Sequence, residues 1–206
     1  MTRRSRPAPR PRGRPAGVSA SRNRGALRVV AGTFGGRRLD VPGGEGTRPT
    51  SDRVREAVFN ALESLGAVAG AIVVDAFAGS GALGIEALSR GADRATFAEV
   101  DATALEVLRG NVDALGVADR ARVVAGPARA AIAAGGPWDL VLLDPPYAFD
   151  GWDELLGDVA AALAPEGLVV IESDREVPLL ASLRGVRSRT YGGTVVQFAR
   201  PSGAPT

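Results

Sequence analysis

From residue 71 onward, short apolar runs alternate with amphipathic segments, and this alternation limits the possible folds most strongly. Leu140–Leu143 is a continuous apolar run, which is typical of a strand buried on both faces of a parallel sheet. Strand and helix segments that alternate in this way predict an open, mostly parallel α/β sheet. In such sheets, ligands bind at the carboxyl ends of the strands.

Seven strands and five helices follow from this pattern. The last two strands flank Gly192-Gly193, which predicts an antiparallel pair. We expect strands at 72–75, 95–100, 121–125, 139–143, 168–173, 186–191 and 194–199, and helices at 82–90, 103–115, 128–134, 152–163 and 178–183.

The segment before this alternation has a different character. Residues 1–24 are rich in Arg and Pro, which predicts a disordered tail. Residues 25–66 predict an extension of the fold: a hairpin around Gly35-Gly36, then a helix capped by Thr50 or Ser51. We expect the core domain at 67–200 and a flexible end at 201–206.

The composition excludes several kinds of chemistry. The chain contains no Cys and no His, and all 25 of its basic residues are Arg. These absences exclude disulfides, a Cys/His zinc site, a cysteine nucleophile and a Ser-His-Asp triad. Without Lys, a phosphate-binding P-loop and a Schiff base are excluded as well. An enzyme with this composition depends on carboxylates, hydroxyls, backbone groups, Arg and a bound cofactor, and we expect no metal.

The charge is distributed unevenly. Residues 1–39 contain 11 Arg and no acid, whereas residues 40–206 contain 14 Arg and 23 acids, a net charge of −9. This asymmetry predicts an anionic partner for the N-terminal part, although a solvated extension accounts for the same composition. We find no apolar run long enough for a membrane span and no apolar core of a secretion signal, so we expect a cytoplasmic protein.

A glycine-rich turn follows the first predicted strand of the core. It reads Asp75-Ala-Phe-Ala-Gly79-Ser80-Gly81-Ala-Leu-Gly84, and Glu99 stands at the end of the next strand. Glycines allow a backbone to approach a ligand closely, and a carboxylate at that place can accept hydrogen bonds from ribose hydroxyls. The spacing also fits a dinucleotide fingerprint, so a nicotinamide-dependent oxidoreductase is one possible interpretation.

The acid at the strand end favours another cofactor. The dinucleotide loop begins directly at the strand end, whereas here Asp75 and three further residues precede Gly79. A carboxylate can meet the cationic amino group of an amino-acid-like cofactor, but it would repel a pyrophosphate. The pattern resembles motif I of class I S-adenosylmethionine-dependent methyltransferases.

A second motif, Asp144-Pro145-Pro146-Tyr147, directly follows the apolar strand. Two prolines make a rigid, extended turn that presents the Asp144 carboxylate and the Pro145 carbonyl as acceptors, beside the flat face of Tyr147. Such a site suits a planar ring with an exocyclic amine and can stabilise the positive charge that develops on its nitrogen. The tetrapeptide resembles motif IV of the amino-methyltransferases.

Taken together, these motifs and the N-terminal extension resemble the RsmD family. The resemblance extends over about residues 27–199 and includes Thr47-Arg48-Pro49-Thr50-Ser51-Asp52-Arg53-Val54-Arg55-Glu56 and Tyr191-Gly-Gly-Thr194. It implies a Rossmann-like, seven-stranded class I methyltransferase that uses S-adenosylmethionine on the N2 amine of a guanine in small-subunit ribosomal RNA. Its partner would be that RNA or the assembling small subunit, and we expect a monomer.

The resemblance also indicates which residues form the site. The catalytic positions are Asp144, Pro145, Pro146 and Tyr147, and the cofactor positions are Asp75, Phe77, Ala78, Gly79, Ser80, Gly81, Glu99, Val100 and Ala128. Many methyltransferases hold the adenine amine with an Asp after the third strand, but here the segment is Ala125-Gly126-Pro127-Ala128. Candidate RNA-binding residues are Arg28, Arg37, Arg38, Arg48, Arg53 and Arg55, although Arg53 and Arg55 could instead pair with nearby acids on an exposed helix face.

Two other functions are compatible with the same residues. A DNA adenine or cytosine amino-methyltransferase would share the site chemistry, but such enzymes usually carry a separate target-recognition domain. A nucleic-acid-binding module could keep the cofactor fold without turnover. A DNA enzyme would transfer methyl groups to DNA and not to RNA. Substitution of Asp144 by Ala would abolish turnover in an enzyme but would change nothing in a pure binding module.

Overall fold

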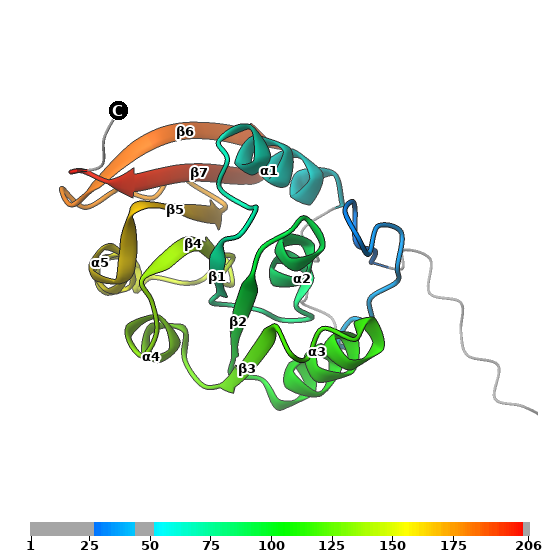
Figure 1. The fold of residues 1–206 in the computed structure, drawn as a ribbon. Helices are drawn as coiled ribbons and strands as arrows, with labels where there is room; N and C mark the ends of the chain where they lie inside the picture. Colours follow the sequence, from blue (N-terminus) through cyan, green and yellow to red (C-terminus); the bar gives the residue numbers. More distant parts are fainter. Residues whose placement is uncertain (1–26, 44–51, 204–206) are drawn as a thin grey trace, which may run out of the picture.

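The computed structural model describes residues 27–43 and 52–203, and Figure 1 shows their fold. Strands and helices alternate from β1 to β5, as the sequence predicts, and β5, β6 and β7 then follow one another without a helix between them. The helices are α1 (Asp52–Ser64), α2 (Ala82–Ser89), α3 (Ala102–Leu115), α4 (Ala128–Ala133) and α5 (Trp152–Ala162), and the strands are β1 (Ile72–Asp75), β2 (Arg94–Glu99), β3 (Ala121–Ala125), β4 (Trp138–Leu143), β5 (Leu163–Ser173), β6 (Leu183–Tyr191) and β7 (Thr194–Pro201).

The seven strands form one sheet in the order β3-β2-β1-β4-β5-β7-β6. The first five of these are parallel, whereas β7 is antiparallel to both β5 and β6. The chain moves outward from β1 through β2 to β3 and then returns to the other side of β1 with β4. The switch in strand order therefore lies between β1 and β4, which is where open α/β sheets bind their ligands.

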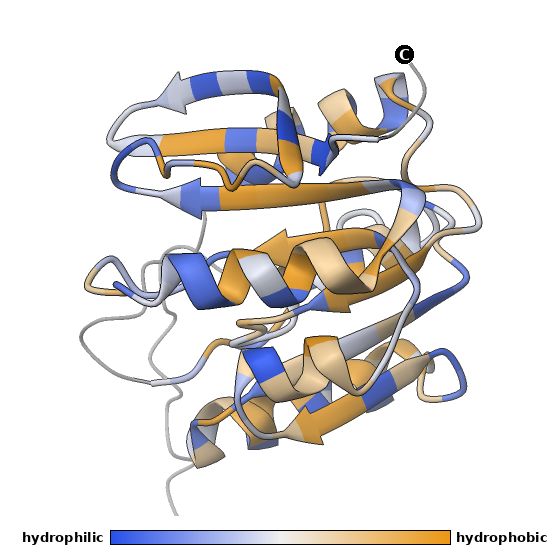
Figure 2. Ribbon diagram, turned by 90° about the vertical axis from the view of Figure 1, so that its left-hand side faces the viewer, coloured by the Kyte–Doolittle hydropathy of each residue, from blue (hydrophilic) through white to orange (hydrophobic). Residues whose placement is uncertain are grey.

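Helices cover both faces of the sheet (Figure 1). One buried cluster joins α1, α2 and α3 to the sheet and includes Phe59, Phe97 and Phe198. The other lies under α4 and α5 and includes Trp138 and Trp152. The inner strands are mainly hydrophobic, whereas the edge strand β6 is mostly hydrophilic or neutral (Figure 2). The continuous apolar run of β4 is thus explained by burial on both faces.

The N-terminal extension forms less β-structure than the sequence predicts. Within residues 27–43, the pairing consists of a single antiparallel bridge between Arg28 and Arg38. The ladder does not extend because neighbouring backbone groups bond to α2 instead: Val30 and Ala31 donate to the Glu86 carboxylate at 2.7 and 3.0 Å. The turn also spans Thr33–Gly36 and not Gly35-Gly36 alone.

Two other parts of the chain bear on the predictions. Residues 178–183 are not helical: the Gln197 side chain bonds both the backbone N–H and the carbonyl of the preceding Val177, and Leu183 N–H donates to the Leu180 carbonyl at 2.9 Å in a turn that leads into β6. The predicted tail at 1–24, the capping residues Thr50 and Ser51, and Arg48 lie outside the described residues. No helix within residues 27–43 and 52–203 is long and apolar enough to cross a membrane.

Candidate functional site

The glycine-rich turn between β1 and α2 is fixed by its own backbone and by β2. Ala78 N–H donates to the Ala98 carbonyl at 3.0 Å, and Gly81 N–H donates to the Ala78 carbonyl at 2.6 Å. Gly79 and Gly81 have φ angles of 52° and 85°, which favour glycine. A Cβ at Gly84 would lie 2.3 Å from the Phe97 ring, so this third glycine allows α2 to pack closely on the sheet. The turn is therefore shaped to bring backbone close to a ligand.

Glu99 connects this turn to the end of β2. Its Oε2 accepts from Gly79 N–H at 2.7 Å, while its Oε1 accepts from Val100 and Asp101 N–H groups at 2.8 Å each. A carboxylate has about four lone-pair positions, so these three donors leave capacity for one further hydrogen bond. The carboxylate is held in place at the β1–β2 edge, where the sequence predicts a ribose.

Asp75, at the end of β1, is the most perturbed acid near the turn. Its Oδ2 accepts from Gly84 N–H at 2.9 Å, but its buried Oδ1 has no hydrogen-bond partner among the described residues. Burial raises the pKa of Asp75 to about 7; the Gly84 bond opposes this shift, and the Asp144 and Glu99 charges add to it. A buried acceptor without a partner suits a cationic donor such as an amino group.

A cleft of about 610 Å³ opens beside Glu99. Its lining includes Glu99 and Val100 at the end of β2, the rings of Phe77 and Phe149, and Ala128 at the start of α4. The side chain of Val100 is 71% exposed and offers an apolar surface. Arg129 and Asp158, which form an ion pair at 2.5 Å, also line the cleft. Mostly apolar walls with one fixed carboxylate fit a nucleoside.

The Asp144-Pro145-Pro146-Tyr147 segment leaves β4 at the switch in strand order. Phe149 N–H donates to the Pro146 carbonyl at 2.8 Å and closes a turn after the prolines. Tyr147 is 42% exposed, and its hydroxyl lies 3.5 Å from Thr194 Oγ1 at the start of β7. The Tyr147 ring therefore stands at the surface, where a planar group could stack on it.

The two predicted motifs meet in space. β1 and β4 are neighbours, with Asp75 in register with Leu142, so Asp144 follows two residues further along the next strand. The Phe77 ring, from the glycine turn, contacts the Phe149 ring edge-on, with centroids 5.5 Å apart. Phe149 is a site residue that the sequence analysis missed. A second aromatic residue five positions after Asp144 was the only available signal.

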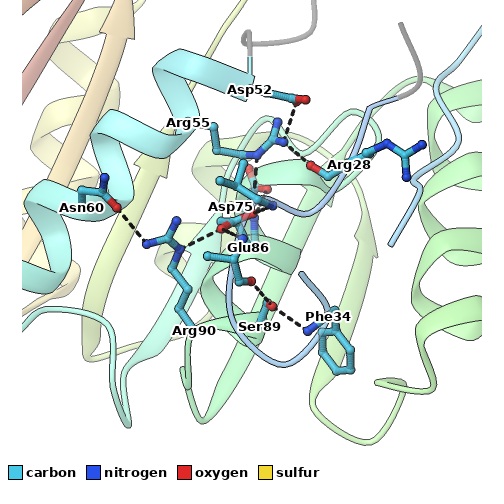
Figure 3. Close-up of polar contacts among 12 residues, drawn as sticks. Arg28, Phe34, Asp52, Arg55, Asn60, Asp75, Glu86, Ser89 and Arg90 are labelled. Carbon is cyan, nitrogen blue, oxygen red and sulfur yellow. Dashed lines mark hydrogen bonds and ion pairs between the residues drawn. The ribbon is translucent and has the colours of Figure 1, made fainter. Parts of the chain in front are cut away.

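The N-terminal extension is attached to α2 by a buried ionic network (Figure 3). Glu86 is fully buried and accepts hydrogen bonds from Val30 and Ala31 N–H and, at 2.7 Å, from Arg90 Nε. Arg55 Nε lies 3.6 Å from the same carboxylate, and Arg55 Nη2 donates to Asp52 and to the Arg28 carbonyl. Since α2 begins directly after the glycine turn, this network connects the extension to the cofactor side of the site.

The position of Arg55 corrects one prediction. Its side chain is fully buried and engaged within the protein, so it is not available to contact RNA. Arg37, Arg38 and Arg53 are exposed and Arg28 is partly exposed. Arg28 and Arg37 donate to the carbonyls of Gly36 and Ala114, each at 2.8 Å. These four remain candidates for RNA contact.

A further bond ties the extension to the turn. The buried Asn111 of α3 donates to the Ser80 carbonyl at 2.9 Å and to the Asp40 carbonyl at 3.0 Å, and it accepts from Asp40 N–H at 2.8 Å. One side chain thus holds the glycine turn and the extension in a fixed relation. The sequence gives no sign of this, because the three residues are far apart in the chain.

Comparison with known proteins agrees with this geometry. The profile of the family described as Conserved hypothetical protein 95 matches residues 27–200. The chain belongs to this family, which is the RsmD family. The Escherichia coli K12 protein named Ribosomal RNA small subunit methyltransferase D is 41% identical over 155 residues, which is 74% of this chain and 77% of that protein.

Two further relatives are similar over most of the chain. The Haemophilus influenzae protein of the same name is 34% identical over 163 residues, 76% of this chain and 83% of that protein. Among solved structures, that of the Escherichia coli protein yhhF superposes with a TM-score of 0.76 at 37% identity, over 86% of this chain and 98% of that one. The fold is that of the class I methyltransferases.

Proposed function

We propose that this S-adenosylmethionine-dependent methyltransferase methylates the exocyclic N2 amine of a guanine in small-subunit ribosomal RNA. The observation that carries the proposal is the meeting of the cofactor cleft and the Asp144–Tyr147 segment at the β1–β4 switch, joined by the Phe77–Phe149 contact. Relatives named as small-subunit methyltransferases support the choice of RNA. The reaction would take place in the cytoplasm.

On the cofactor side, each part of S-adenosylmethionine has a group that fits it. Glu99 would accept from a ribose hydroxyl, Val100 and Ala128 would contact the adenine, and the unpaired Oδ1 of Asp75 would receive the amino group. The glycine turn lets the ligand lie against backbone. When bound, the cofactor supplies a methyl group on a positively charged sulfur. No lysine, histidine or metal is needed for this arrangement.

On the amine side, the protein would orient and activate the nitrogen. The guanine amine is conjugated with its ring and is a weak nucleophile. The Asp144 carboxylate and the Pro145 carbonyl would accept its two N–H groups, localise its lone pair and stabilise the positive charge that develops on nitrogen. Pro146 fixes this edge through its turn with Phe149, and Tyr147 would stack on the base. The proton then leaves to Asp144 or to water.

Methyl transfer to three substrates tests the proposal. Labelled S-adenosylmethionine is incubated with unmodified small ribosomal subunits, with their protein-free RNA and with duplex DNA, and the nucleosides are identified by mass. We expect N2-methylguanosine from one of the ribosomal samples, and the better sample identifies the assembly state that is recognised. Methyladenine or methylcytosine in DNA would refute the assignment to RNA.

Substitution of Asp144 tests the role of the tetrapeptide. We expect D144A to lower kcat by at least about 100-fold while RNA affinity stays within about twofold, because the carboxylate acts on the amine in the transition state. D150N is the matched control, since Asp150 is exposed in the same loop and lies outside the proposed site. An unchanged kcat in D144A would refute the mechanism, and wild-type protein that binds RNA without turnover would indicate a binding module.

A further inference from the structure

The C-terminal strand pair stands out by its charge. Residues 183–206 contain four Arg and no acid, whereas residues 40–182 contain ten Arg and 23 acids. A local charge of +4 thus lies at one edge of a domain that is otherwise strongly acidic. Three of these cations, Arg184, Arg187 and Arg189, are on β6, the last strand of the sheet.

These three side chains are exposed, and β6 is exposed from Arg184 to Thr190. None of the three forms an ion pair with any residue in 27–43 or 52–203. In Figure 2, β6 is the uppermost strand and is mostly hydrophilic or neutral, whereas the inner strands are mainly hydrophobic. The cations are therefore presented to solvent with their charge uncompensated.

Strand pairing places two of them on one face. Arg187 is in register with Phe198 and Arg189 with Val196, and side chains of paired residues project to the same side of a sheet. Phe198 and Val196 belong to the core under α1 and α2, so both arginines lie on that face of the sheet, and both are exposed. Residues two apart in a strand are about 7 Å apart, which is comparable with the distance between successive phosphates of an extended RNA strand.

This row of charges leads to the amine site. Tyr191 continues the same face after Arg189, and it pairs with Thr194 across the turn. Thr194 Oγ1 lies 3.5 Å from the Tyr147 hydroxyl of the Asp144–Tyr147 segment. A nucleic acid strand whose base lies on Tyr147 would therefore continue along β6 over cations.

Edge strands carry charge for a second reason. Charged side chains on an outer strand prevent it from pairing with another chain, and β6 needs such protection. Either sign of charge would serve that purpose. A strand that carries only cations, within a domain that is otherwise acidic and next to the amine site, is instead complementary to phosphate.

From this we infer that β6 is a binding surface for the RNA backbone, in which Arg187 and Arg189, with Arg184 beyond them, hold the phosphates that flank the methylated nucleotide. This inference rests on the proposed function, because it extends the RNA from that site. The contacts are with phosphate and not with bases, so they add affinity and register without selecting a sequence.

Charge reversal separates the two roles of these arginines. R187E/R189E keeps a charged edge, so protection against aggregation is preserved, but it opposes phosphate. The matched control is R94E/R122E, since Arg94 and Arg122 are exposed on β2 and on the opposite edge strand β3, and the change in net charge is the same. Binding of full-length protein to protein-free small-subunit RNA is measured between about 50 and 300 mM salt. In this range the logarithm of the binding constant is expected to fall linearly with the logarithm of the salt concentration.

We expect R187E/R189E to weaken binding about tenfold or more at 0.15 M salt and to lower the salt slope by about 1.4 to 1.8, the effect of two phosphate contacts. The KM for RNA should rise accordingly, while kcat at saturating RNA and the KM for S-adenosylmethionine stay unchanged. R94E/R122E should bind like wild type. R187Q/R189Q removes the two charges without reversing them, so a loss of RNA affinity that is smaller than in R187E/R189E would support the assignment.

Two results would overturn the inference. One is a salt slope in R187E/R189E equal to that of wild type, and the other is an equal loss in both reversal variants. A thermal melt shows that each variant is folded. Binding is measured without turnover, so the β6 surface is tested even if wild-type protein makes no N2-methylguanosine, in which case the proposed function fails separately.

Discussion

At the scale of single residues, Asp75 controls how the cofactor side responds to pH. Burial raises the pKa of its carboxyl from 3.8 to about 7, so the folded protein keeps a proton that the unfolded chain has lost. Between about pH 4 and 7, the folded state binds more protons, and the free energy of unfolding therefore falls as pH rises, by up to about 4 kcal/mol. A cationic amino group beside the carboxylate would favour the ionised form.

We therefore expect the affinity of wild-type protein for S-adenosylmethionine to increase about tenfold per pH unit from pH 5 to 7 and to level off above pH 7, with proton release on binding. D75N should bind weakly at all these pH values and, without cofactor, should lose less stability than wild type between pH 4 and 8. Calorimetry in two buffers measures the released proton. D139N is the control, because Asp139 also accepts a backbone N–H but lies at the far end of β4. A pH-independent wild-type affinity would contradict this role.

At the scale of elements, the ionic network decides how the extension packs on α2. Glu86 and Glu63 both pair with Arg90, at 2.7 and 3.0 Å, but the Glu86 side chain is fully buried and that of Glu63 is 49% exposed. We expect E86A to lower the free energy of unfolding by about 3–5 kcal/mol, because Arg55 and Arg90 lose a buried partner and two backbone N–H groups lose their acceptor. E63A should cost less than about 1 kcal/mol. Urea unfolding compares them, and similar losses would show that the network does not stabilise the extension.

Comparison of the predicted and observed elements shows which parts of the fold and of the site follow from the sequence. Apolar runs and glycine spacing predict the seven strands, their parallel core and the position of both motifs, because these features depend on neighbours within a few residues. Arg55 was not predictable in this way: beside Asp52 it resembles one half of a surface pair, and its buried partner Glu86 is 31 residues away. The same holds for the helix predicted at 178–183: the Gln197 side chain, from β7, bonds the preceding Val177.

At the scale of the whole molecule, a cationic N-terminal segment, residues 1–39, precedes an acidic remainder, residues 40–206. Eight of the chain's arginines fall in residues 1–24, and replacing them all by Gln would take eight positive charges from a net of +2 and leave −6. Such a protein would approach RNA with a repulsive field at long range, whereas its cofactor cleft and amine site would be unchanged.

For that Gln variant, we expect the association rate with small-subunit RNA at low salt to fall about tenfold or more, and the difference from wild type to shrink as salt increases. Stopped-flow binding measures this rate, and kcat at saturating RNA and affinity for S-adenosylmethionine should stay as in wild type. Replacing the same eight arginines by Lys is the control, because it keeps the charge and removes the guanidinium geometry. If the Lys variant associates with RNA as fast as wild type, the N-terminal arginines act through their positive charge and not through the geometry of the guanidinium group. If both variants associate as fast as wild type, the asymmetry does not steer RNA, and β6 and the exposed arginines of the extension are the cationic surfaces that remain.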